Sequence, residues 1–248
     1  MQHPDTIYFY GTCLIDMLYP NAGLSAMKLI SNAGVEIIFP QQQTCCGQPA
    51  FNSGYRAEAL DVARQQLASF KRPIPIVVPS GSCAGMIKHH WPELFSGEPD
   101  EAEALAASDR VYELTEFLVD VLKLKLTDKG SQMNIAVHTS CSARREMGVA
   151  KHIKQLIGQL NQVEVVEHDR KKECCGFGGS FAIKQGDISG AIVNDKCQAI
   201  EETGVTTLVS QDCGCLMNIG CALEKRQSEI RTLHIAEFIW ERTCDTDD

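Results

Sequence analysis

The stretch Cys-Cys-Gly occurs twice in this chain of 248 residues, as Cys45-Cys46-Gly47 and again as Cys174-Cys175-Gly176. Each triplet is preceded by a single cysteine, Cys13 or Cys141, and the spacing from cysteine to triplet is nearly the same in both halves. A near-constant offset between corresponding residues indicates an internal duplication. The repeated triplet therefore predicts two related domains, which we place at residues 1–128 and 129–248, where Lys129-Gly130-Ser131 interrupts the pattern.

A further cysteine follows each triplet. In the first half it is Cys83, and in the second half it is Cys213 or Cys215. Adding the offset of the other cysteines to Cys83 gives a position that is closer to Cys213 than to Cys215. This slightly favours Cys213. Each half therefore offers at least four thiols.

Short apolar runs alternate with helical stretches around these cysteines. Strands are predicted at residues 7–10, 35–39 and 76–78 and at 135–137, 163–166 and 207–209, and helices at 21–32, 55–70, 143–160 and 188–202. This alternation predicts parallel βαβ units and hence an α/β fold, with a third strand closing each half. The acidic segment 97–103 and residues 109–129 are expected to form a surface segment, a helix and a linker.

In each half, all three cysteine positions (the single cysteine, the adjacent pair and the late cysteine) lie in segments that follow predicted strands. Loops at the carboxyl ends of parallel strands are where open α/β sheets bind ligands. We therefore expect the cysteines of each half to converge on one site.

Composition narrows the class of protein. The formal net charge of −9 and the pI near 5.3 argue against a nucleic-acid surface, since no basic stripe is present to neutralise phosphates. No apolar stretch is long enough for a transmembrane helix, and the residues from Met1 to Asp5 do not resemble a secretory signal. We expect a cytoplasmic protein that reaches a membrane, if at all, through partners, and whose twelve cysteines are thiols or metal ligands rather than disulfides.

Four thiolates in each half suit either a [4Fe–4S] cluster or a tetrahedral zinc ion. A simple zinc ribbon would have two close Cys-x-x-Cys knuckles, which neither half has, and ligand spacings above thirty residues are unusual for structural zinc. Buried inert thiols would explain single cysteines but not the duplicated pattern. That plainer explanation is preferred for Cys197, Cys221 and Cys244.

Glycines follow each cysteine pair. Gly47 and Gly176 supply a residue that tolerates positive φ, which lets the chain turn so that two adjacent thiolates reach one centre. Gly178 and Gly179 either bring backbone N–H groups near cluster sulfurs or form a plain turn. They are not a phosphate-binding loop, because no Gly-Lys-Ser/Thr follows.

Several polar residues beside the cysteines are further candidates. His138 stands where the first half has Tyr10, and it either donates a hydrogen bond to a cluster sulfur, relays protons, or is a core or capping histidine. Arg144 and Arg145 follow Cys141 and either attract a carboxylate substrate or an acidic partner, or are solvated. His234 and Glu237 are expected on one face of the C-terminal helix, as structural residues or partner contacts.

The chain resembles the Cys-Cys-Gly, or cysteine-rich, domain iron–sulfur proteins. The resemblance is closest to the lactate utilization protein A family, and more distant to the heterodisulfide reductase B subunit and the iron–sulfur subunits of glycolate oxidase and anaerobic glycerol-3-phosphate dehydrogenase. It implies two duplicated Rossmann-like βαβ domains. The matching segments are CCGQPAFNSGY at 45–55, SGSC at 80–83, HTSC at 138–141, CCGFGG at 174–179 and HIAE at 234–237.

The resemblance also implies two sets of metal ligands. The first set is Cys13, Cys45, Cys46 and Cys83, and the second is Cys141, Cys174, Cys175 and one late cysteine. The local pattern Cys215-Leu216-Met217-Asn218 matches the family's late segment and favours Cys215 over Cys213. The heterodisulfide reductase pattern ends in Cys-x-x-Cys, whereas Met86 stands three residues after Cys83. This departure favours a cubane [4Fe–4S] cluster, one or two per chain, over the non-cubane cluster of that relative.

The function implied is electron transfer within an L-lactate dehydrogenase complex, which oxidises L-lactate to pyruvate and passes electrons towards quinone. The implied partners are a ferredoxin-type iron–sulfur subunit and a third small subunit. Neither a Gly-x-Gly-x-x-Gly motif nor a ferredoxin cysteine run is present, which fits a subunit role. Two alternatives stay open: a chain that itself converts a 2-hydroxy acid or a heterodisulfide, and a zinc-stabilised scaffold. Zinc in one half only is also compatible with the sequence.

Overall fold

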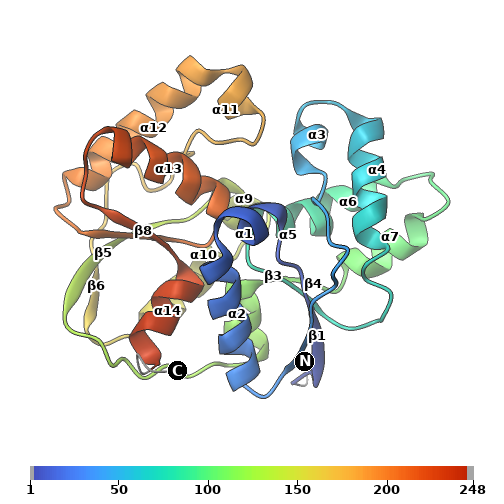
Figure 1. Ribbon diagram of the computed structural model, residues 1–248, viewed down its shortest axis with the longest axis horizontal. Helices are drawn as coiled ribbons and strands as arrows, with labels where there is room; N and C mark the ends of the chain where they lie inside the picture. Colours follow the sequence, from blue (N-terminus) through green and yellow to red (C-terminus); the bar gives the residue numbers. More distant parts are fainter. Residues whose placement is uncertain (1–2, 245–248) are drawn as a thin grey trace.

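In the part of the chain that the structure describes, eight short strands form two parallel sheets, one in each half (Figure 1). The computed structural model describes residues 3–244. The outer ends of the two predicted domains, and Met1 and Gln2 of the segment compared with a secretory signal, lie outside that range. The first sheet has the order β2-β1-β3-β4 and the second β6-β5-β7-β8. The strands are β1 (Thr6–Phe9), β2 (Glu36–Ile38), β3 (Ile76–Val78), β4 (Val111–Glu113), β5 (Met133–His138), β6 (Val163–Val165), β7 (Thr207–Ser210) and β8 (Arg231–His234).

The matching strand orders confirm the α/β fold and the duplication, but the prediction of three strands in each half was wrong. Each sheet gains a fourth, edge strand. Strand β4 lies in the segment that was expected to be only a helix and a linker, and β8 precedes the C-terminal helix. With three residues in β4 and an exposed arginine opening β8, neither strand is long or apolar enough to show a clear alternation.

Helices follow nearly every strand. The predicted helix at 143–160 is two helices, because Gly148 adopts a φ of 66° between them. The helices of the first half are α1 (Cys13–Leu18), α2 (Pro20–Asn32), α3 (Gln48–Asn52), α4 (Arg56–Leu67), α5 (Gly81–Gly85), the π-helical η1 (Met86–His90), α6 (Trp91–Leu94), α7 (Glu101–Ser108), α8 (Leu114–Glu116) and the π-helical η2 (Phe117–Val121). Those of the second half are α9 (Cys141–Arg145), α10 (Ala150–Ile157), α11 (Phe181–Lys184), α12 (Gly186–Glu201), α13 (Cys213–Lys225) and α14 (Ile235–Thr243).

The two sheets share one apolar core. The C-terminal helix α14 packs on α2 of the first half (Figure 1). Helices α8 and η2 of the first half pack on α10 of the second. Phe9 and Phe238, one from each half, belong to the same buried cluster. Burial of shared apolar surface therefore fixes the two sheets relative to one another.

The segment between the sheets is also anchored. Asp128 forms an ion pair of 2.6 Å with Arg242 of α14, and both side chains are buried. Asp128 also accepts hydrogen bonds from the backbone N–H groups of Gly130 and Gln162. The predicted linker is thus held in place, and the division of the chain at residues 128 and 129 stays a proposal.

The fourth strand of each sheet ends in the same capping arrangement. Glu113 ends β4 and caps α8 in a capping box with Glu116. His234 ends β8, accepts a hydrogen bond from the N–H of Ala236 through Nδ1 and forms a capping box with Glu237. His234 therefore lies at the start of the C-terminal helix rather than on its face, and its role there is structural.

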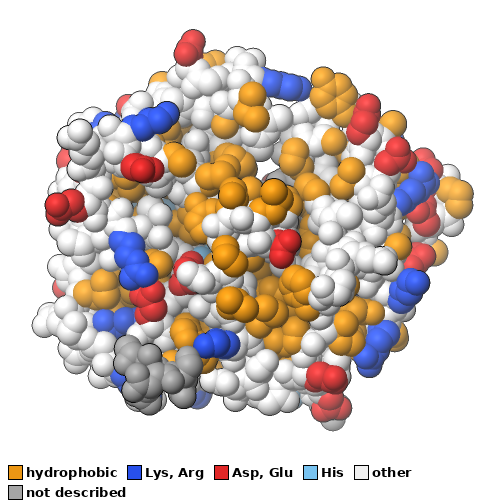
Figure 2. All heavy atoms as spheres, viewed as in Figure 1, with side chains coloured by type: hydrophobic (Ala, Val, Ile, Leu, Met, Phe, Trp, Pro, Cys, Tyr) orange, Lys and Arg blue, Asp and Glu red, His pale blue; other side chains and the backbone are white. Residues whose placement is uncertain are grey.

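Apolar side chains gather in the centre of one face of the molecule, over α1 and α2 (Figure 2). Met17, Leu18 and Leu24 belong to these helices, and more than half of each side chain is exposed. Exposed apolar patches of this kind are typical of protein interfaces. Among residues 3–244, no helix is both long enough and apolar enough to cross a membrane.

Candidate metal centres

The first set of cysteines converges as predicted. Cys13 is the first residue of α1 after β1, and Cys83 lies in α5 after β3. The pair Cys45 and Cys46 follows β2 in the loop before α3. All four line one cavity of about 110 Å³ at the carboxyl ends of the strands.

The thiols of this set form a continuous chain of contacts. Cys45 hydrogen-bonds with Cys13 and Cys46, and Cys46 hydrogen-bonds with Cys83. Hydrogen bonds from Cys13 and then Cys46 lower the pKa of Cys45 to about 3, whereas hydrogen bonds with Cys45 and Cys83, together with burial, raise the pKa of Cys46. One sulfur is therefore stabilised as a thiolate among closely spaced neighbours, which is the donor set that iron–sulfur clusters and zinc require.

The second set repeats this arrangement. Cys174 hydrogen-bonds with Cys141 and Cys175, which lower the pKa of Cys174 to about 2. The Sγ atoms of Cys175 and Cys215 are 3.2 Å apart. Cys141, Cys174, Cys175 and Cys215 thus form the same sequence of contacts as the four cysteines of the first half.

The late cysteine that joins the second set is Cys215. Cys213 points elsewhere: it is buried against Ile15 and Ala22 of the first half and lines the cavity of the first set. Burial raises the pKa of the Cys213 thiol.

The preference for Cys213 from the offset between the halves was therefore misleading. Cys83 stands as far beyond Val78, the end of β3, as Cys215 stands beyond Ser210, the end of β7. The extra residues of the second half lie earlier, between its cysteine pair and β7, so the offset grows before the late cysteine is reached.

The glycines after the pairs have the predicted backbone conformation. Gly47 has a φ of 90° and Gly176 a φ of 85°. A Cβ atom on Gly176 would lie 2.8 Å from the carbonyl oxygen of Ser189, so no larger residue fits. Gly176 N–H donates to Cys174 Sγ at 3.3 Å, and Phe177 N–H donates to Cys175 Sγ at 3.5 Å. The turn therefore brings backbone donors to the sulfurs.

Gly178 and Gly179, which follow the second triplet, have different surroundings. Gly178 packs against Phe181. Gly179 lies against Pro49 and lines the cavity of the first cysteine set, across the interface between the halves. The expectation that they bring N–H groups to sulfurs of their own half stays a prediction.

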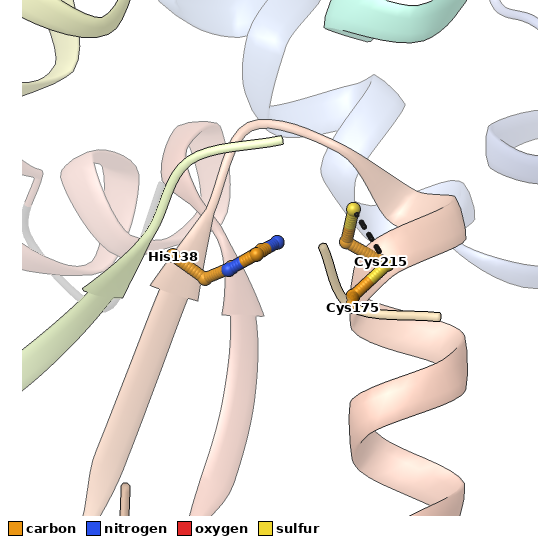
Figure 3. A group of neighbouring side chains, drawn as sticks. All are labelled: His138, Cys175 and Cys215. Carbon is orange, nitrogen blue, oxygen red and sulfur yellow. Dashed lines mark hydrogen bonds between the residues drawn. The ribbon is translucent and has the colours of Figure 1, made fainter. Parts of the chain in front are cut away.

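His138 lies beside the second set. It ends β5, and its imidazole points towards Cys175 and Cys215 at the start of α13 (Figure 3). The ligand atoms of these three residues lie within 4.8 Å of one another. Burial lowers the pKa of His138 to about 3, so the ring is neutral.

Both ring nitrogens of His138 are buried, and within the described part of the chain neither has a hydrogen-bond partner. An unpaired buried donor is unfavourable unless something at the site accepts from it. Its counterpart Tyr10 is satisfied, since its hydroxyl donates to the carbonyl of Thr44 at 2.8 Å. The second set therefore fits a bound group that has acceptor atoms, such as the sulfides of a cluster.

The two sets adjoin one another. The buried carboxylate of Asp212 accepts from the N–H of Ser82 at 2.8 Å and from the N–H of Gly214 at 3.1 Å. These donors directly precede the late cysteines, Cys83 and Cys215. One side chain therefore contacts the backbone of both sites.

Asp212 and Lys196, both buried, were not predicted from the sequence. Lys196 lies on α12 and donates to the carbonyl of Arg170, and the charges of Cys175, Cys174 and Cys215 act on it. Lys196 is one of several polar residues of its helix, and nothing in the local pattern distinguishes it. Asp212 directly precedes Cys213, where α13 begins, and aspartate is a common residue at a helix N-terminus, so this position was the available signal.

Comparison with known proteins assigns this architecture. The family model described as Cysteine-rich domain matches residues 7–88 and 135–220, one copy in each half. The chain therefore belongs to the cysteine-rich domain family.

Individual relatives match nearly the whole chain. A protein named Lactate utilization protein A from Geobacillus sp. (strain WCH70) is 42% identical over 95% of this chain and 99% of its own. Lactate utilization protein A 2 from Bacillus cereus (strain Q1) is 42% identical over 94% of this chain and 97% of its own. Among solved structures, a hypothetical protein from Helicobacter pylori aligns with a TM-score of 0.68 at 12% identity, covering 98% of this chain and 50% of that one. This last likeness concerns the fold alone.

Proposed function

We propose that this chain is an iron–sulfur electron-transfer subunit of a complex that oxidises L-lactate to pyruvate. The observation that carries the proposal is the pair of adjoining cysteine sets, each with the same contacts at the carboxyl ends of parallel strands. The names of the relatives supply the substrate, since they are called lactate utilization protein A.

Each cysteine set would hold one [4Fe–4S] cluster. The ligands would be Cys13, Cys45, Cys46 and Cys83 in one site and Cys141, Cys174, Cys175 and Cys215 in the other. A bound cluster supplies reversible one-electron transfer at a potential that its surroundings set. Cys213 is left out because it is directed away from the second set.

The remaining residues of the site orient the cysteine ligands and tune the potential of a bound cluster. The N–H groups of Gly176 and Phe177 donate to sulfurs, which stabilises added negative charge. His138 keeps a neutral ring whose N–H is available to an acceptor in the site. Asp212 fixes the backbone beside both late cysteines, so the two sites keep one relative position.

Two adjoining one-electron sites match the stoichiometry of the reaction. Oxidation of L-lactate to pyruvate releases two electrons and two protons. In the proposed complex the electrons pass through this chain and a ferredoxin-type iron–sulfur partner towards a quinone, which takes up two electrons and two protons. Exposed Met17 and Leu18 lie on the helix that begins at Cys13, and this supports a role as a subunit rather than as an isolated enzyme.

Metal analysis tests the cofactor. Protein purified without oxygen should contain about eight irons and eight acid-labile sulfides per chain, at four of each per cubane cluster, and should give an EPR signal on reduction. About four irons would mean that only one half holds a cluster. Zinc in the same sample would mean that the other half binds zinc. Zinc without sulfide would replace the electron-transfer proposal with a structural scaffold.

Growth tests the reaction. Deletion of the gene should abolish growth on L-lactate, and expression of the unchanged chain should restore it. The variant Cys45→Ser should fail to restore growth, whereas the matched control Cys221→Ser should succeed, because Cys221 is exposed. Normal lactate oxidation by extracts that lack the chain would refute the proposed role.

A further inference from the structure

A cavity of about 310 Å³ lies between α10 and the edge strand β6, away from the cysteine sulfurs. Its floor is apolar and is formed by Val137 of β5, Val163 and Val165 of β6, and Ile157 of α10. Val137 and His138 are neighbours on one strand, so their side chains point to opposite faces of the sheet. The cavity therefore lies on the face of the second sheet opposite to His138 and is separate from the metal site.

The mouth of this cavity is strongly basic. Four cationic side chains line it, and the single carboxylate among the lining residues is Glu167. Glu167 is already paired, with Lys171 at 2.8 Å and Lys154 at 3.5 Å, and these contacts lower its pKa. Within the described residues, no carboxylate pairs with the other two cations, Arg144 and Lys172.

Arg144 is held in place without being neutralised. Its guanidinium donates to the backbone carbonyls of Lys171, at 3.3 Å, and of Lys172. Two of its five N–H donors are thereby used and its charge is unpaired. An oriented guanidinium with unused donors is suited to binding a carboxylate.

Arg144 and Lys172 come from the two segments that carry cysteines of the second site. Arg144 lies in α9, three residues after Cys141, and Lys172 is two residues before Cys174. An anion held by Arg144 and Lys172 would therefore lie next to the loops of the second cysteine set, with any apolar part directed onto the valine floor.

The duplicated first half provides an internal comparison. There Asp16 stands in the place of Arg144, three residues after Cys13. The cavity on the corresponding face of the first sheet is lined by Phe9, Asp16 and Phe39, and none of its lining residues among the described part of the chain is a lysine or arginine. The excess of positive charge is therefore a property of the second half and not a consequence of the fold.

We propose that this cavity binds a small organic carboxylate, with the carboxylate on Arg144 and Lys172 and an aliphatic body on Val163 and Val165. The choice of a 2-hydroxy or 2-oxo acid as ligand rests on the function proposed above. The volume is at the lower end of the range of small-molecule sites and exceeds what lactate fills. Each further methylene buried on the valine floor should strengthen binding about fourfold.

Calorimetric titration of the anaerobically purified full chain tests the site. The probes are L-lactate, 2-hydroxybutyrate and 2-hydroxyhexanoate, with sodium sulfate as an anion that has no apolar body. Affinity is expected to rise along the acid series and to exceed that for sulfate. Lys172→Gln and Arg144→Gln should each weaken acid binding about tenfold or more. Arg145→Gln should leave it unchanged, because Arg145 is a neighbouring exposed cation that does not line the cavity.

Three results would overturn the inference: no saturable binding of any acid at millimolar concentration, equal weakening by the Arg144 and Arg145 variants, or equal affinity for sulfate and 2-hydroxyhexanoate. The iron and sulfide contents of the same samples separate this inference from the proposed function. Fully loaded protein that binds no acid refutes the cavity alone. Acid binding by a chain that holds zinc and no sulfide refutes electron transfer and leaves the cavity.

Discussion

Lys196 and Gln66 occupy corresponding positions in the two halves, and both side chains are fully buried. Lys196 lies seven residues after Ser189, whose carbonyl faces Gly176. Gln66 likewise lies seven residues after Ala59, whose carbonyl faces Gly47. Gln66 accepts a hydrogen bond from the N–H of Thr44 at 2.6 Å, whereas Lys196 donates to the carbonyl of Arg170. Beside one cysteine set there is thus a neutral amide, and beside the other an amine.

This difference predicts unequal potentials for the two proposed clusters. Burial lowers the pKa of Lys196, whereas the thiolate charges that a bound cluster would fix at Cys175 and Cys215 favour the protonated amine. A nearby cation stabilises the extra electron of a reduced cluster, so the second site should be the more easily reduced. Electrons would then move from the first site to the second, if both hold the same cluster type.

The variant Lys196→Gln tests this directly. It should lower the potential of the second cluster by an amount on the order of tens of millivolts and leave that of the first unchanged, as followed by an EPR-monitored redox titration. Lys151→Gln removes an exposed cation from the same half and should shift neither potential. Equal potentials in the unchanged protein would contradict the argument before any variant is made.

Serine substitutions distinguish the two late cysteines. Cys215→Ser should remove about half of the iron and sulfide, because it deletes a sulfur that contacts Cys175. Cys213→Ser should keep both contents and lower the free energy of unfolding by about 1–3 kcal/mol, because it buries a hydroxyl against Ile15 and Ala22. Iron and sulfide analysis with urea denaturation measures both effects. The reverse pattern would make Cys213 the ligand.

The sequence was sufficient for those parts of the fold that depend on local pattern. Strand β3 at Ile76–Val78 has the predicted bounds, because a fully buried parallel strand reads as a continuous apolar run. The edge strand Val111–Glu113 could not be found in this way, since its strand character comes from pairing with β3 rather than from its own residues.

The grouping of the cysteines was predictable to the same extent as the fold. Spacing and strand ends were enough to group the cysteines, because parallel strands bring their carboxyl ends to one edge. The choice between Cys213 and Cys215 depended on which of them faces the site from α13, and counting residues cannot give that orientation. Lys196 lies at the site only through tertiary packing, so no local pattern marks it. Asp212 is recognisable as a helix-capping residue, but its contact with Ser82 of the first half depends on tertiary packing.

Glycine substitution tests the turn after the first cysteine pair. Gly47→Ala should lower the free energy of unfolding of the cluster-free chain by about 1–3 kcal/mol, because φ is 90° and the new Cβ would lie 2.9 Å from the carbonyl oxygen of Ala59. Gly186→Ala is the control: nothing lies within 4 Å of its Cβ position, and helix propensity should make this change neutral or stabilising by at most about 1 kcal/mol. Urea denaturation compares the two, and equal effects would argue against a strained turn at Gly47.

The buried cap at His234 predicts a loss of stability in acid. Burial lowers the pKa of His234 to about 4, whereas an unfolded histidine titrates near 6.5. Between these two values the unfolded chain binds a proton that the folded chain does not. The contribution of His234 to the free energy of unfolding is therefore fully present above about pH 6.5. It decreases as the pH drops towards 4, by up to about 3 kcal/mol.

Replacement of His234 by asparagine isolates this contribution, because asparagine caps a helix and does not titrate. The other buried histidines, His138, His152 and His168, are present in both proteins, so their effects cancel in the comparison. Urea denaturation of the cluster-free chain at pH 7.5 and pH 4.5 should show a smaller difference for His234→Asn than for the unchanged protein. His89→Asn makes the same exchange at an exposed position and should keep the full difference. An undiminished pH dependence in His234→Asn would mean that folding does not lower the pKa of His234.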